Sequence, residues 1–186
     1  AHALPERVSQ VGVLSCGGPF DAPAAFAGMG RANRMMWSAI DRRPRLARFM
    51  LGQQAKMVAK NPTKAATQAI KTLSGADKGA IAGLTSDQQL GFFTGPMSEA
   101  FANGPDAVYE DMSILRRPWD FDIAQVNQRV QLWHGDADTS APAAMAEYLV
   151  ARLPSCVPHF GVGEGHISTI LADIDDALRV LGPQRS

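Results

Sequence analysis

Two short segments near the end of the chain carry residues that could catalyse proton transfer. Residues 134–138 read HGDAD, and residues 163–166 read GEGH. A carboxylate that accepts the N–H of an imidazole fixes the ring's tautomer and stabilises its protonated form. The imidazole can then act as a general base toward a nucleophile or a water molecule. Asp138 and His166 are therefore candidate catalytic residues, provided that the fold brings their segments together.

Three short apolar runs predict the strands that would position these segments. The runs span 8–16, 129–134 and 157–162; the first is rich in β-branched residues and the third gives the weakest pattern. Helical patterns follow the second and third runs, and strands that alternate with helices predict a parallel α/β sheet. Because ligands bind at the carboxyl ends of strands in such sheets, both polar segments should share one edge.

The two helices that alternate with these strands have recognisable starts. Thr139 or Ser140 is the predicted cap of the first helix, with Pro142 tolerated in its first turn. Ser168 is the predicted cap of the last helix. Its spacing of apolar residues predicts an inward face made of Ile170, Leu171, Ile174, Ala177, Leu178 and Leu181.

The middle of the chain, from about 24 to 118, predicts helices and no comparable strand. Helices are expected over 24–60 with a break at Pro44, from Pro62 to about Ser74, over 86–103, and over 107–115. The many methionines of this region are first of all helix-packing residues, and some of them could line an apolar acyl pocket.

The segment 130–168 resembles the acid-loop and histidine-loop region of the α/β-hydrolase fold superfamily. In that family an apolar strand leads into H-G-x-x-D, a proline follows, and a later loop ends in G-x-G-H. Here the same features are HGDAD, Pro142 and GEGH. The resemblance implies that Asp138 is the catalytic acid and His166 the catalytic histidine of a triad, with Asp136 at a variable position.

The resemblance also implies how the chain is organised. The fold class is α/β, a partial α/β-hydrolase sheet made of the last three parallel strands with a helical cap insertion. Residues 1–23 would form a core strand and its flanks, 24–118 the helical cap, and 119–186 the C-terminal part of the core with the acid and histidine loops.

The nucleophile elbow of the family, G-x-S-x-G or its Asp variant, is absent from the sequence. The nearest match is VLSCG at 13–17, which lacks the first small residue and continues into Gly18 and Pro19, where a helix should start. Ser15 is therefore not expected to be the nucleophile. Because the family order is nucleophile, acid, histidine, and the chain begins with Ala1, we expect the nucleophile and the first strands to lie upstream.

Other reactive residue types have structural explanations in the sequence. His134 and His159 are expected to be structural residues of strands, and Cys16 a small core residue. Two cysteines far apart indicate reduced thiols and a cytoplasmic protein, and no metal or organic cofactor is implied. A net charge of zero gives no footprint for nucleic acid, and no apolar run reaches the about 18 residues of a membrane span.

The favoured function is hydrolysis of a small apolar ester or related acyl substrate by a Ser-Asp-His triad whose nucleophile is outside this chain. An epoxide hydrolase or dehalogenase with an upstream Asp is an alternative, but epoxide hydrolases of this fold use two cap tyrosines. Only Tyr109 falls in the cap region, since Tyr148 follows the acid loop. A further alternative is a non-catalytic interaction module with a relic Asp/His pair.

The predicted sheet would leave an apolar edge without a partner strand. We therefore expect the chain alone to be inactive and poorly stable, unless an N-terminal fragment or a second copy completes the sheet.

Overall fold

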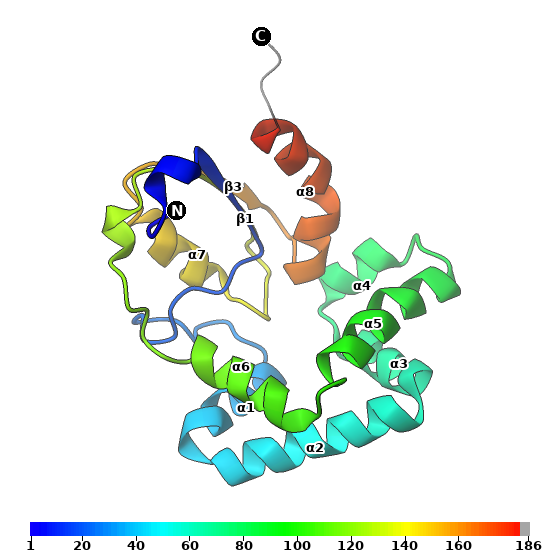
Figure 1. The fold of residues 1–186 in the computed structure, drawn as a ribbon. Helices are drawn as coiled ribbons and strands as arrows, with labels where there is room; N and C mark the ends of the chain where they lie inside the picture. The colour runs from blue at the N-terminus through cyan, green and yellow to red at the C-terminus, as the bar shows by residue number, and fades with distance from the viewer. Residues whose placement is uncertain (183–186) are drawn as a thin grey trace. The chain divides into compact units, whose positions relative to one another are not determined.

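The computed structural model describes residues 1–182 and divides the chain into two compact units (Figure 1). The first, here called the α/β unit, consists of Ala1–Gly30 and the chain from Pro118 onward. The second, the helical unit, is Arg31–Arg117. None of the helices in the described part of the chain is long and apolar enough to cross a membrane.

Three parallel strands form the sheet of the α/β unit. They are β1 (Gln10–Leu14), β2 (Arg129–Gly135) and β3 (Cys156–Gly161), in the order β1-β2-β3. Val11 pairs with Val130, and Trp133 pairs with His159. The prediction of a parallel sheet is confirmed, and the carboxyl ends of all three strands lie at one edge.

The two faces of this sheet pack against different helices, α7 (Ala143–Val150) and α8 (His166–Leu181) (Figure 1). Leu132 of β2 is fully buried against Ala146 and Leu149 of α7. On the opposite face, a Cβ added at Gly12 of β1 would lie 2.2 Å from Cδ1 of Leu181 in α8. Side chains alternate between faces along a strand, so glycine at this position lets α8 approach the sheet closely.

Both helices of the α/β unit start differently from the prediction. The cap residue of α7 is Pro142, and neither Thr139 nor Ser140 caps it. The helix begins later because the backbone N–H of Ser140 donates to the carboxylate of Asp138, which holds the chain in a turn. Ser168 lies inside the first turn of α8, and its hydroxyl oxygen accepts the N–H of Gly165.

The predicted inward face of α8 is wrong for half of its residues. Leu171, Ile174 and Leu178 are 39%, 38% and 62% exposed. The residues buried beneath the helix are Ile167, Ser168, Thr169 and Ala177. The apolar periodicity of α8 therefore marks two surfaces, one on the sheet and one that no described residue buries.

Six helices make up the helical unit, within the residues that the structure describes. Prolines stand at the first turns of three of them, where a missing N–H has no cost, and Thr85 caps α5 through a reciprocal capping box. Residues 24–28 form turns and no helix starts before Arg31, so the first helix starts later than predicted. The helices are α1 (Arg31–Arg42), α2 (Pro44–Lys60), α3 (Pro62–Thr72), α4 (Gly75–Ile81), α5 (Ser86–Ala100) and α6 (Pro105–Leu115).

Candidate active site

The structure brings Asp138 and His166 together at the carboxyl edge of the sheet. Asp138 follows β2, and His166 follows β3 as the first residue of α8. Nδ1 of His166 lies 2.8 Å from Oδ2 of Asp138. Since an ionised carboxylate can only accept, Nδ1 is the protonated nitrogen of a neutral His166, and Nε2 is its basic atom.

The carboxylate of Asp138 is held by the backbone of its own loop. Its side chain has no exposed surface. Oδ1 accepts the backbone N–H of Ser140 at 2.7 Å and that of Ala141 at 2.9 Å, while Oδ2 faces His166. Hydrogen bonds from N–H groups stabilise a carboxylate and fix its plane, so the two oxygens have separate tasks.

His166 combines a buried anchor with an accessible ring. The side chain is 35% exposed, whereas Gly165 before it and Ile167 after it are buried. The hydroxyl of Ser15, directly after β1, donates to the backbone carbonyl of His166 at 2.7 Å. The first turn of α8 is thus fixed to the end of β1, which orients the imidazole.

The two loops that carry the pair are joined to each other. The backbone N–H of Gly163 donates to Oδ1 of Asp136 at 2.7 Å, and that of Ala137 donates to the carbonyl of Glu164 at 2.9 Å. A Cβ added at Gly135 would lie only 2.2 Å from the carbonyl oxygen of Glu164. Asp136, expected at a variable position, therefore holds the histidine loop, and Gly135 permits its close approach.

Two further histidines lie on the strands, as the sequence suggests, but their surroundings differ. His159 of β3 is half-buried, stacks on Trp133 and shares a 2.9 Å hydrogen bond with the side chain of Gln131. His134 of β2 is completely buried and lies beside the acid loop, with Nε2 2.8 Å from the carbonyl oxygen of Ala141. Burial lowers the pKa of His134 below its ordinary value, although the Ala141 carbonyl and Asp138 act in the opposite direction.

Ser15 and Cys16 lack the features of nucleophiles. Ser15 is only 6% exposed, and its hydroxyl donates to a backbone carbonyl rather than to an imidazole. Burial raises the pKa of the Cys16 thiol to about 11, which disfavours the reactive thiolate. Ser15 adopts φ of +45°, a conformation that sequence reasoning did not anticipate because it is unusual for residues other than glycine.

The described residues contain no group of three or more His, Cys, Asp or Glu side chains arranged to hold a metal ion. What the site does contain is an imidazole with one defined basic nitrogen and a buried carboxylate behind it. This arrangement can take a proton from a hydroxyl group and return it to a leaving group.

Comparison with solved structures shows that the fold corresponds to part of an α/β-hydrolase fold. No family model and no curated protein sequence matches the chain. A hydrolase from Oleispira antarctica aligns with a TM-score of 0.54 at 13% identity, over 98% of this chain and 59% of that protein. The esterase RhEst1 from Rhodococcus sp. ECU1013 aligns with a TM-score of 0.56 at 13% identity, over 95% and 56%. The chain therefore spans under three fifths of the length of these hydrolases.

Proposed function

We propose that this chain supplies the acid and the histidine of a carboxylic-ester hydrolase whose nucleophile lies outside it. The observation that carries the proposal is the 2.8 Å contact between His166 Nδ1 and a fully buried Asp138 carboxylate that two backbone N–H groups orient. That geometry defines the tautomer that a general base needs.

The proposed reaction has two proton transfers through His166. Nε2 takes the proton of the nucleophile as it attacks the ester carbonyl, and Asp138 stabilises the imidazolium. The imidazolium then gives this proton to the departing alcohol, leaving an acyl-enzyme. In the second half, Nε2 takes a proton from water, which attacks the acyl group, and the proton returns to the nucleophile as the acid leaves.

The nucleophile and the remaining strands would come from a polypeptide segment that pairs with β1. Among the described residues, no strand pairs with the outer edge of β1, whose sequence QVGVL contains no charge and no proline. The other outer strand, β3, carries Pro158, which cannot donate to a further strand. The edge of β1 is therefore the one that suits extension of the sheet.

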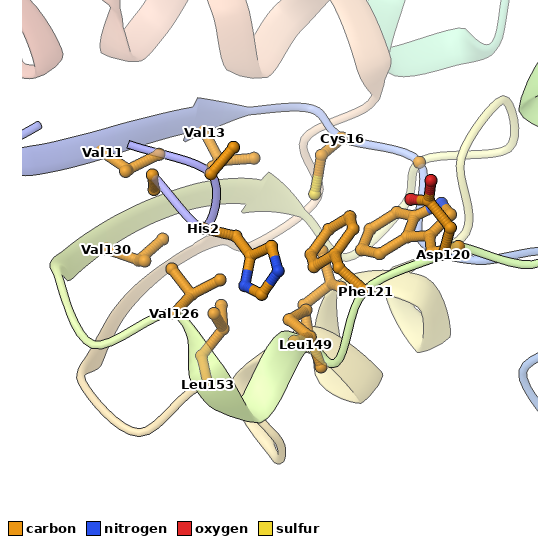
Figure 2. Close-up of a pocket in the computed structure, with 15 residues that line it drawn as sticks. His2, Val11, Val13, Cys16, Asp120, Phe121, Val126, Val130, Leu149 and Leu153 are labelled. Carbon is orange, nitrogen blue, oxygen red and sulfur yellow. The ribbon is translucent and has the colours of Figure 1, made fainter. Parts of the chain in front are cut away.

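Apolar surface lies on both sides of this edge. On the α7 side, Val11 and Val13 line a pocket of about 600 Å³ together with Phe121 and Leu149 (Figure 2). On the α8 side lie the exposed Leu171, Ile174 and Leu178. Exposed apolar surface is typical of an interface, and a segment with strands and flanking helices would cover both faces.

The choice of an ester over an epoxide rests on a tyrosine. Epoxide opening by this fold needs phenol groups that protonate the ring oxygen. The hydroxyl of Tyr109 in α6 donates to the backbone carbonyl of Ile40 at 3.2 Å, and Arg48 lies over its ring. Tyr109 is thus engaged within the helical unit, and Tyr148 lies in α7.

The proposal is tested with the complete enzyme, in which this chain is joined or combined with the segment that completes the sheet. Asp138→Asn should lower kcat for short-chain esters by roughly 10⁴-fold, as in other triads, and His166→Ala should do so too. His159→Gln is the matched control and should retain most activity. A loss below tenfold in the two site variants would indicate a relic pair in an interaction module.

The position of the nucleophile can be tested separately. A fluorophosphonate probe should label a serine outside this chain, and Ser15→Ala should remain labelled. Labelling of Ser15 itself would contradict the proposed division of the triad. Epoxide or haloalkane turnover without labelling would indicate an Asp nucleophile instead.

A further inference from the structure

His134 lies beside the proposed catalytic pair, and its surroundings are unusual for a core residue. It is completely buried on the α7 face of β2 and lies four residues before Asp138 in the sequence. Its Nε2 approaches two oxygens, the carbonyl of Ala141 at 2.8 Å and Oδ2 of Asp138 at 3.7 Å. The first distance is that of a hydrogen bond, and the second is too long for one.

These contacts define the protonation state of the ring. A carbonyl oxygen can only accept, so Nε2 of His134 carries the proton that Ala141 accepts. In the part of the chain that the structure describes, Nδ1 of His134 is buried and has no hydrogen-bond partner. A protonated Nδ1 would bury a charged N–H without an acceptor, which is costly, so the ring stays neutral.

Ala141 connects His134 with the catalytic acid. The carbonyl of Ala141 accepts from His134, and its N–H donates to Oδ1 of Asp138 at 2.9 Å. The backbone of Ala141 thus bonds to the ring of His134 through its carbonyl and to the carboxylate of Asp138 through its N–H, so the position of His134 affects that of the carboxylate. If His134 did not bond to Ala141, its Nε2–H could donate to Oδ2 of Asp138 instead. That oxygen is the one that accepts from His166.

We propose that His134 is a positioning residue, which fixes the acid loop through the carbonyl of Ala141 and thereby leaves Oδ2 of Asp138 to His166. The inference rests on the proposed function, since it assigns a role to His134 in that same site. If His134 only filled space in the core, its side-chain volume would matter, but an N–H donor at the position of Nε2 would not.

Two amide variants separate the donor from the volume. In His134→Gln the side-chain nitrogen can reach the position of Nε2, whereas in His134→Asn it is too short and falls near Nδ1. His134→Leu is a second variant without a donor. His159→Asn is the matched control, because it alters a strand histidine whose ring bonds to Gln131 rather than to the acid loop.

The readout is the low-field NMR resonance of the His166 Nδ1–H in the complete protein, in which the sheet is completed as in the test of the proposed function, and it is assigned by its loss in Asp138→Ala. We expect this resonance to be retained in His134→Gln and His159→Asn and to be lost or shifted upfield in His134→Asn and His134→Leu. An unchanged resonance in either donor-free variant that folds would overturn the proposal, as would its loss in His134→Gln.

A measurement on the unaltered chain does not depend on any variant folding. The ¹⁵N shifts of His134 near pH 7 should be those of a neutral ring with its proton on Nε2, and a proton on Nδ1 would overturn the inference. Because neither readout needs turnover, absence of ester hydrolysis would count against the proposed function alone, while an unaffected resonance would count against the role of His134 alone.

Discussion

The α/β unit and the helical unit differ in where most of their described polar contacts lie. In the α/β unit, Asp138, His134 and Ser15 are buried, and each bonds to backbone or to another polar side chain of the site. In the helical unit, Asp77 is buried and bonds to Ser74, but the ion pairs Arg48–Asp106 and Arg116–Asp41 are partly exposed to solvent and join helices that pack through apolar residues. The first unit depends on fixed polar geometry, whereas the second depends on shape, so sequence changes should have different consequences in each.

Removal of a core leucine should have the largest effect and should separate the units. Leu132 and Leu51 are 0% and 2% exposed, and truncation of either to alanine should cost about 3 kcal/mol of stability in urea unfolding. Leu132 packs beneath α7, so only Leu132→Ala should also disturb the His166 Nδ1–H resonance. If Leu51→Ala disturbed that resonance equally, the contrast between the units would be lost.

Alanine in place of glycine should have effects of opposite sign. At Gly135 the new Cβ would meet the Glu164 carbonyl, and we expect a loss of about 2 kcal/mol. At Gly91, inside α5, a Cβ has open space, and the variant should gain about 0.5–1 kcal/mol because alanine favours a helix. Urea unfolding measures both changes. A Gly135→Ala variant of unchanged stability would show that the acid loop and the histidine loop can separate freely.

A smaller effect is expected from pH. The pKa of His134 is lowered by burial, so the unfolded chain binds a proton there more readily than the folded chain. Stability should therefore fall as the pH drops below the ordinary value of about 6.5 toward the lower folded pKa. His134→Gln should reduce this dependence, measured as urea midpoints at pH 7.5 and pH 5.5. The same reduction in His159→Gln would contradict the assignment.

The smallest change is expected at a surface ion pair of the helical unit. The side chains of Arg48 and Asp106 are 44% and 70% exposed, so solvent and salt screen their attraction. Asp106→Asn should change stability by less than about 0.5 kcal/mol, and 1 M NaCl should remove the difference from the unaltered chain. A larger loss that persists in high salt would place the helical unit under the same polar constraint as the other unit.

The predictable parts of the molecule were those that local patterns encode. Short apolar runs bounded by glycine indicated the three strands, and the HGDAD and GEGH segments indicated which residues would meet. The short helix α4 was missed because glycine occupies two of its seven positions, Gly75 and Gly79. Leu171 and Leu178 were placed inward because periodicity shows that a face is apolar but not what covers it.

The parts of the site that sequence could not predict depend on backbone atoms. The role of Asp136 required the position of the Gly163 N–H, and that of His134 required the carbonyl of Ala141. A carbonyl or amide group leaves no signature in the side-chain sequence. The left-handed backbone of Ser15 could not be predicted either, because that conformation favours glycine. Here Ser15 is held by hydrogen bonds to the backbone of Trp133 and His166.

The bonds that orient the acid and the histidine fall almost entirely within one continuous stretch, residues 134–169, with Ser15 as the outside contributor. Such a stretch can be inherited as one block. Recombination that exchanged the helical unit would leave the contact between Asp138 and His166 assembled, because both residues lie outside Arg31–Arg117. In descendants of this chain, the segments around residues 134–169 could then be replaced while those residues themselves persist.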